Sequence, residues 1–163
     1  MFLGPWEDGG PFNVQGITGI WRWLNRVWKL SLNPPSGMID SPAKGEALRA
    51  ITHKTIRKVT KDAERFHFNT MISSLMEFSN ELQRTCKGGE VDKDSWEESI
   101  EAMLLLLSPL APHITEELWH LTGRDYSIHN QSWPLWDDKI VQDELHLWEQ
   151  YRRYLPLLKE ASP

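Results

Sequence analysis

The sequence predicts an all-α fold: a helical bundle of about five helices, with an N-terminal loop and a partly extended C-terminal segment. Apolar residues recur at helical spacing in five separate segments, and no run alternates between apolar and polar residues for long enough to form a sheet. Prolines and glycines fall between these segments, where they end one helix and allow the next to begin. With 163 residues, 40% of them apolar, the chain can bury one core of ordinary size.

The first helix is expected over residues 17–32, after a loop rich in Gly and Pro at residues 1–15. Its apolar residues share one side of the helix: Ile17, Ile20, Trp21, Leu24, Val27 and Trp28. Trp23 and Leu30 lie off this stripe and indicate a second packing surface. Two prolines directly after Asn33 end the helix, since proline cannot continue it.

The second helix, residues 48–66, carries the pattern that matters most for function. Ser41 and Pro42 suit its N-cap and first turn. One side is apolar to weakly polar: Leu48, Ile51, Thr52, Thr55, Val59, Ala63 and Phe66. The other side holds cations at spacing that places them within an arc of roughly 100°: Lys54, Arg57, Lys58, Lys61 and Arg65. The pattern predicts a helix that packs by one face and presents positive charge on the other.

Two further helices follow. The third is expected over residues 69–84, with Asn69 as its cap and a glycine pair after Lys87 to stop it. The fourth should open at Ser95, because Glu98 stands three residues later in the capping-box pattern. The end of this helix is apolar all round, so it should be the most buried helix.

The last segments are shorter. Pro112 can start a fifth helix that ends at Gly123. Residues 128–136 should be extended, and residues 143–158 are weakly helical.

Composition excludes several classes of protein. Cys86 is the single cysteine, so the chain has no internal disulfide, which fits a reducing compartment. No apolar run approaches the roughly 18 residues that span a bilayer, and no secretion signal is present, so we expect a cytoplasmic location without membrane contact. The net charge is −5, so contact with a nucleic acid would have to come from a local patch of positive charge.

Five segments together resemble a known family. In order they are MFLGPWEDGG, GIWRWLNRVWKL, THKTIRKVTKDAERFHFNTMISSLMEFSNEL, LLLLSPLAPHITEELW and SIHNQSWPLWD. They closely resemble the tRNA-binding helical domain, often called the anticodon-binding domain, of bacterial-type leucyl-tRNA synthetases, which are class I aminoacyl-tRNA synthetases. Each segment alone is weak evidence, because the related valine, isoleucine and methionine enzymes share the general pattern.

The resemblance implies that residues 1–138 form a tRNA-binding domain, with residues 1–15 as the linker from a catalytic domain. The HIGH-type and KMSKS-type signatures of that catalytic domain are absent, so we expect this chain alone to be inactive and to need no cofactor. The parent enzyme would use ATP to ligate leucine to tRNA. The tail, residues 139–163, does not match the family pattern, and its structure stays open.

The resemblance also gives the cations a role, because in this family the domain grips tRNA along its stems, with little reliance on anticodon bases in bacterial leucine enzymes. An RNA duplex is recognised through its shape, its phosphates and its 2′-OH groups. The cations of the second helix are therefore our first candidates for RNA contact. A second set on the first helix could instead pair with acids of a neighbouring helix: Arg22, Arg26 and Lys29. The ordinary alternative for both sets is a solvated helix face.

Other candidates are weaker. His113, Glu117 and His120 share one helix face, but the spacing and the lack of nearby cysteine speak against a metal site. Trp133 and Trp136 could stack on unpaired bases, although covering the end of the bundle is the more ordinary role. No catalytic constellation is present in the sequence.

Two alternative functions stay open beside the leucine module, whose partners would be tRNA and the catalytic domain of the parent enzyme. One is a helical module from a valine, isoleucine or methionine synthetase. The other is a protein-interaction bundle that docks through Trp6, Trp23 and the N-terminal loop.

Overall fold

The computed structural model describes residues 14–88 and 90–141, and confirms the all-α expectation. Its main elements are five α-helices: α1 (Val14–Leu32), α2 (Pro42–Glu64), α3 (Phe68–Lys87), α4 (Lys93–Leu107) and α5 (Pro112–Leu121). A 3₁₀ helix, η2, covers Ile128–Asn130. α1 begins inside the segment expected to be a loop, and the helix expected at residues 143–158 lies outside the described residues.

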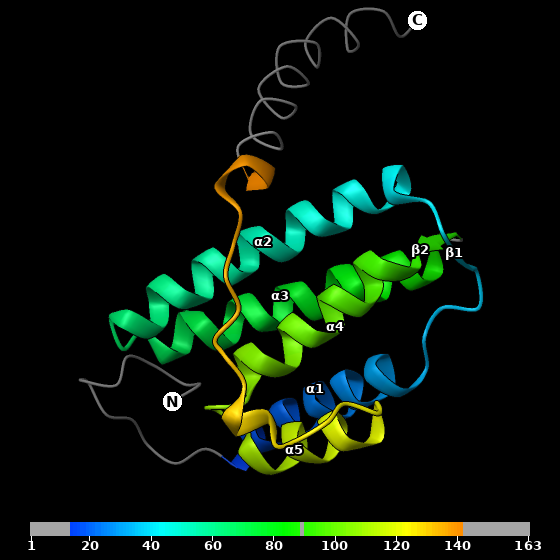
Figure 1. Cartoon of the computed structure of the whole chain (residues 1–163). Coiled ribbons are helices and arrows are strands. Elements are labelled where there is room, and N and C mark those ends of the chain that lie inside the picture. The colour runs from blue at the N-terminus through cyan, green and yellow to red at the C-terminus, as the bar shows by residue number, and fades with distance from the viewer. Residues whose placement is uncertain (1–13, 89, 142–163) are drawn as a thin grey trace, which may run out of the picture.

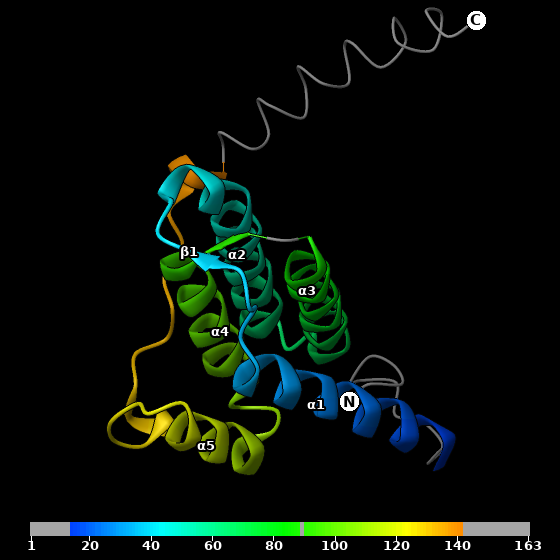
Figure 2. The same cartoon turned by 90° about the vertical axis from the view of Figure 1, so that its right-hand side faces the viewer.

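Three long helices, α2, α3 and α4, lie side by side, and α1 and α5 pack across one side of them (Figures 1 and 2). All five helices contribute side chains to one buried core. In α4 every side chain from Ala102 to Leu107 is buried, which confirms the expectation of a helix end that is apolar all round. None of the described helices is long and apolar enough to cross a membrane.

The contact between α2 and α4 is close because small residues line it. Gly45 of α2 lies against the first turn of α4, next to Ser95. Farther along the same contact, the hydroxyl groups of Thr52 and Ser99 are hydrogen-bonded at 2.8 Å.

A short parallel strand pair joins the start of α2 to the start of α4. β1 (Met38–Ile39) pairs with β2 (Val91–Asp92), and two residues are too few to show an alternating pattern in the sequence. This pair fixes Asp92, whose carboxylate accepts hydrogen bonds from the backbone N–H groups of Ser95 and Ser41, both at 2.9 Å. Asp92 is therefore the N-cap of α4, and the prediction that Ser95 caps this helix is wrong.

Two other helix ends differ from the prediction. α3 begins at Phe68, with His67 and not Asn69 at the N-cap, and it continues to Lys87. α2 begins after Ser41 with Pro42 in its first turn, as predicted, but ends at Glu64. Phe66 then takes a positive φ of 58° and is 66% exposed, because the chain turns there toward α3. The prediction that Phe66 completes the apolar stripe of α2 is wrong.

α1 buries the second packing surface predicted from Trp23 and Leu30, and part of the predicted stripe, Ile20, Leu24 and Trp28, packs against the core beside it. Trp23, Val27 and Leu30 are buried, whereas Ile17 and Trp21 are 51% and 64% exposed. The indole N–H of Trp23 donates to Ser79 Oγ of α3 at 3.1 Å, so Trp23 is a core residue and is not available for docking a partner. α1 contacts α3 on one side and α5 on the other, and these two neighbours select the buried face.

After η2, residues 131–138, which we call the strap, cross α4 and α2 (orange in Figure 1). Hydrogen bonds hold the strap to α2: the indole N–H of Trp133 donates to Thr60 Oγ1 at 2.8 Å, and the N–H of Asp137 donates to His53 Nδ1 at 3.0 Å. The expectation of an extended segment holds for residues 132–136, whereas residues 128–130 form η2. Trp133 and Trp136 pack against the core from this segment.

Candidate nucleic-acid interface

The five cations of α2 do not form one uniformly open surface. Arg57 is half-buried, and its guanidinium lies 3.9 Å from the carboxylate of Asp138 in the strap. Lys58 Nζ lies 3.8 Å from Glu77 of α3, although both side chains are largely exposed. The strap and α3 thus neutralise part of the predicted stripe.

The remaining cations of this stripe are exposed: Lys54, Lys61 and Arg65. Within the part of the chain that the structure describes, no carboxylate pairs with Lys61 or Arg65, which lie near the C-terminal end of α2. The open positive charge of α2 is therefore concentrated beside the turn into α3.

The strap also contacts a polar network between α2 and α4, through His53. Because His53 Nδ1 accepts a backbone N–H, the ring carries its proton on Nε2. That nitrogen lies 3.0 Å from Glu98 Oε1, and Arg49 lies 3.3 Å from the other oxygen of the same carboxylate. This network connects α2, α4 and the strap, so its polar groups are engaged inside the molecule.

A second positive surface lies between α1 and α3, in a hollow of about 580 Å³ that we call the basic groove. The side chains that line it are Trp21, Arg22, Asn25, Arg26, Lys29, Leu30 and Asn33 from α1 and its end, and Gln83, Cys86 and Lys87 from α3. All three cations predicted on the first helix lie here, and Lys87 adds a fourth. None of the lining residues is a carboxylate.

The two arginines of this groove donate to neutral groups. Arg26 donates from Nη1 to Asn80 Oδ1 of α3, and Arg22 donates from Nε to the carbonyl of Thr18 at 3.4 Å. Lys29 and Lys87 line the groove, and neither forms an ion pair with any residue in the ranges 14–88 and 90–141. Among the described residues, therefore, the groove keeps its positive charge, and these cations do not pair with acids of a neighbouring helix.

The sequence alone does not connect Lys87 with the first helix, because the two lie far apart along the chain. The only signal at Lys87 is its position before a glycine pair, which indicates a helix stop and no more. Cys86 beside it is half-buried, and this burial raises the pKa of its thiol.

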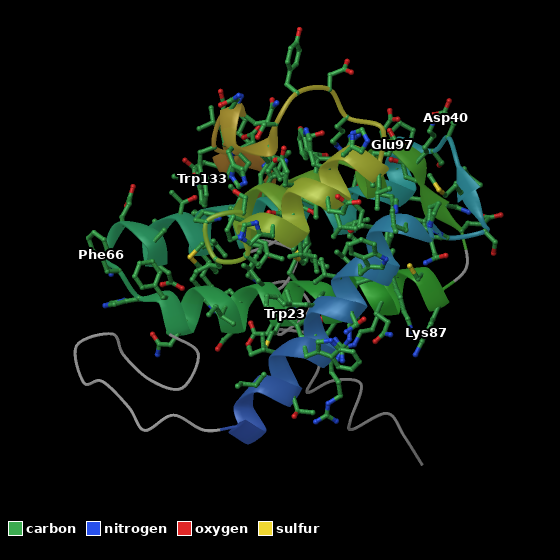
Figure 3. The ribbon with its side chains drawn as sticks, turned by 90° about the horizontal axis from the view of Figure 1, so that it is seen from below. Trp23, Asp40, Phe66, Lys87, Glu97 and Trp133 are labelled. Carbon is green, nitrogen blue, oxygen red and sulfur yellow. The ribbon has the colours of Figure 1, made fainter. Side chains whose placement is uncertain are left out.

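A second hollow, of about 880 Å³, has more acids than bases among its described lining residues. It lies between the end of α1, α4, α5 and the strap, and four carboxylates of α4 line it: Asp94, Glu97, Glu98 and Glu101. Figure 3 shows Glu97 and Lys87 on opposite sides of α1. Arg124 is the one cation among its described lining residues, so this hollow suits a polyanion less well than the basic groove does.

The helix face considered for metal binding lies along α5, where His113, Glu117 and His120 are exposed. In the described ranges, no group of three or more His, Cys, Asp or Glu side chains is arranged to hold a metal ion.

Comparison with known proteins gives one family. The model of the anticodon-binding domain of tRNA ligase matches residues 46–157. A leucine–tRNA ligase of Dehalococcoides mccartyi is 45% identical over 145 residues, which cover 89% of this chain and 18% of the relative. A leucine–tRNA ligase of Herpetosiphon aurantiacus is 43% identical, over 88% of this chain and 18% of the relative. The chain thus spans less than a fifth of these relatives.

A solved structure is similar in fold and in sequence. It is a LeuRS of Agrobacterium radiobacter K84 in a ternary complex with tRNA and LeuAMS. The TM-score is 0.68 at 29% sequence identity, and the match covers 81% of this chain and 18% of that chain.

Proposed function

This chain belongs to the family of anticodon-binding domains of tRNA ligases, and from that premise we propose that it is the tRNA-binding module of a leucyl-tRNA synthetase. The module holds tRNA so that a catalytic domain elsewhere in the enzyme, with ATP, can attach leucine to it. Positioning of this kind contributes to catalysis without a reacting group in the module itself. The names of the relatives and the tRNA in the similar complex support this proposal. The cytoplasm, where tRNA is charged, is the compartment that goes with it.

The basic groove is the observation that carries the proposal within this chain. In a chain of net charge −5, this groove gathers four cations, and no carboxylate is among its described lining residues. Lysine and arginine side chains bind phosphates and release condensed counterions, which supplies most of the sequence-independent affinity for nucleic acid. We therefore assign the first contact with tRNA to this groove.

The end of α2 supplies a second contact. Phe66, which marks the turn after α2, and Lys87 lie at opposite ends of the α2–α3 pair in Figure 3. At about 1.5 Å per residue, the 20 residues of α3 span roughly 30 Å. A stiff RNA stem can bridge two positive regions at that separation, so Lys61 and Arg65 act together with the groove.

Charge reversal tests the proposal. The variant Lys29→Glu/Lys87→Glu changes two groove cations, and Lys61→Glu/Arg65→Glu changes two cations at the end of α2. None of these four residues has an acidic partner in the described part of the chain. Each should weaken tRNA binding at least about tenfold at low salt, because each removes cations that neutralise phosphates and adds negative charge beside them.

The matched control is Lys44→Glu/Lys93→Glu, which removes the same number of positive charges from residues already paired with Glu90 and Glu97. Circular dichroism checks that all variants are folded. If the groove variant and the control bind tRNA equally, the groove is not the contact.

Two alternatives have their own readouts. A panel of leucine, valine, isoleucine and methionine tRNAs separates the leucine module from the related modules, since a valine module should prefer the tRNA of its own enzyme. A protein-interaction bundle would show no salt-dependent tRNA binding at all. Its docking surface would also have to exclude Trp23, which is buried.

A further inference from the structure

Trp21 is a large aromatic side chain that the fold leaves outside its core. It is 64% exposed on α1 and lines the basic groove. Arg22 follows it directly, and Asn25 stands one helical turn later, with its amide donating to the carbonyl of Trp21 at 2.8 Å. A flat apolar face and a cluster of cations that have no acidic partner among the described residues therefore share one hollow.

We propose that the basic groove holds one unpaired nucleotide of the tRNA, with its base stacked on Trp21 and its phosphates held by Lys29, Lys87 and Arg22. This inference rests on the proposed function and makes it more specific, since tRNA stems alone could be held by charge without any aromatic residue.

The groove has the size and the lining that such a nucleotide needs. Its volume of about 580 Å³ falls within the range of roughly 300–1,000 Å³ that small-molecule sites occupy. Its walls combine Trp21, the amides of Asn25, Asn33 and Gln83, and four cations. Aromatic side chains that stack on bases, together with a positive surface for the backbone, are the usual means of holding single-stranded nucleic acid.

A base inside a duplex cannot use this site. Paired bases of an RNA helix are stacked on one another, and the deep major groove keeps side chains from them, so a duplex offers only phosphates and 2′-OH groups. An unpaired nucleotide in a loop or a bulge can present a free face. Trp21 should thus distinguish unpaired from paired RNA, which the surrounding cations cannot do.

The first experiment compares three RNA probes with the full chain: tRNA, a short single-stranded oligonucleotide and a blunt-ended RNA duplex. Trp21→Ala should weaken binding of the single strand about 10- to 100-fold and of tRNA by a similar or smaller factor, as expected when one base no longer stacks on an aromatic ring. The affinity for the duplex should change by no more than about twofold, and Trp21→Phe should restore most of the affinity for the single strand. Tyr126→Ala is the matched control, because Tyr126 is 88% exposed and does not line the groove.

The second experiment uses Cys86, the only cysteine of the chain, as a probe inside the groove. Reaction with a maleimide is followed with and without RNA at mildly alkaline pH, because burial raises the pKa of the thiol. The single strand should slow the reaction of the wild-type chain at least several-fold, and should slow that of the Trp21→Ala variant less at the same RNA concentration.

Two results would overturn this inference. The first is that Trp21→Ala binds the single strand as tightly as the wild type does, while Lys29→Glu/Lys87→Glu weakens tRNA binding. In that case the proposed function stands. Trp21, together with the exposed Ile17, would then belong to a contact with another part of the enzyme. The other is an equal weakening for single strand and duplex, which would mean that Trp21 only supports the shape of the groove. A wild-type chain that binds no tRNA would overturn the proposed function itself.

Discussion

Gly45 is the point where two helices approach more closely than any side chain allows. A Cβ atom added at Gly45 would lie 2.6 Å from Ser95 Oγ and 2.7 Å from Asp92 Oδ2. Both atoms belong to the capped first turn of α4, where Asp92 is held by two backbone N–H groups. The absence of a side chain at this position is therefore part of how α2 and α4 pack.

The substitution Gly45→Ala should destabilise the chain by about 1–3 kcal/mol, because the new methyl group displaces the cap of α4. Gly19→Ala is the matched control: Gly19 lies within α1, and a Cβ there would have no neighbour within 4 Å. Since alanine is the better helix former, this control should stabilise the chain by up to about 1 kcal/mol. Urea unfolding of both variants measures the difference, and equal effects would contradict the close contact at Gly45.

Asp92 makes the stability of the folded chain depend on pH. The pKa of this carboxyl lies below its ordinary value, chiefly because the N–H of Ser95 donates a hydrogen bond to it. Hydrogen bonds from Ser41 and the Ser95 hydroxyl and the nearby charge of Arg49 also lower the pKa, whereas burial raises it. The unfolded chain then binds this proton more readily than the folded chain does, so stability rises with pH in this range. The contribution of Asp92 is complete above its ordinary pKa and is lost as the pH falls through the lowered value.

Replacing this carboxyl should remove that dependence. Unfolding free energies of the wild type and Asp92→Asn, measured between about pH 6 and pH 3, should converge as the pH falls, because only the wild type has a charged cap to protonate in this range. Parallel curves for the two proteins would show that other carboxyls control the acid response.

At the scale of the element, α1 shows what a periodic pattern can and cannot predict. The sequence predicted that residues 17–32 form a helix, and α1 contains all of them. It also predicted two packing surfaces, a stripe that includes Trp21 and a second surface at Trp23 and Leu30. It could not predict which of the two is the more deeply buried, because only the neighbouring helices decide that. The contacts with α3 and α5 bury Trp23 and leave Trp21 outside.

The two tryptophans allow a direct test of which surface of α1 is buried. Trp23→Ala should destabilise the chain by about 3–5 kcal/mol, since it empties a buried site and leaves Ser79 without its indole partner. Trp21→Ala should change stability by no more than about 0.5 kcal/mol, because that side chain is mostly in solvent. Thermal unfolding followed by circular dichroism measures both, and a reversed order would mean that the predicted stripe was correct.

The sequence predicted the candidate site in part, as it did the helix α1. Helical spacing predicted that Arg22, Arg26 and Lys29 share a face, and in the structure they share a groove. The sequence could not indicate that Lys87 completes it or that Asp138 partly neutralises Arg57, because both depend on segments that meet only in the folded chain. The cap of α4 was misplaced for the same reason, since the pairing of β1 with β2 fixes Asp92.

For the whole molecule, binding through separated cations implies a characteristic response to salt. The logarithm of the binding constant for tRNA should fall linearly with the logarithm of salt concentration, with a slope set by the number of phosphates neutralised. Lys29→Glu/Lys87→Glu should reduce the magnitude of this slope by about 1–2, close to one for each phosphate that is no longer neutralised. Filter binding at several potassium chloride concentrations gives the slope, and an unchanged slope would mean that other cations neutralise the phosphates.

The opposite charges on the two sides of α1 have a consequence for how an encounter begins. The basic groove on one side of α1 has four cations among its described lining residues, and the hollow on the other side has four carboxylates and one cation, Arg124. This difference gives this part of the molecule an electric dipole. A polyanion that diffuses toward the chain exerts a torque on this dipole before any contact forms, so the acidic side turns away and fewer collisions are unproductive. The arrangement of these helices therefore orients the molecule during its approach to the RNA, as well as binding the RNA once contact forms.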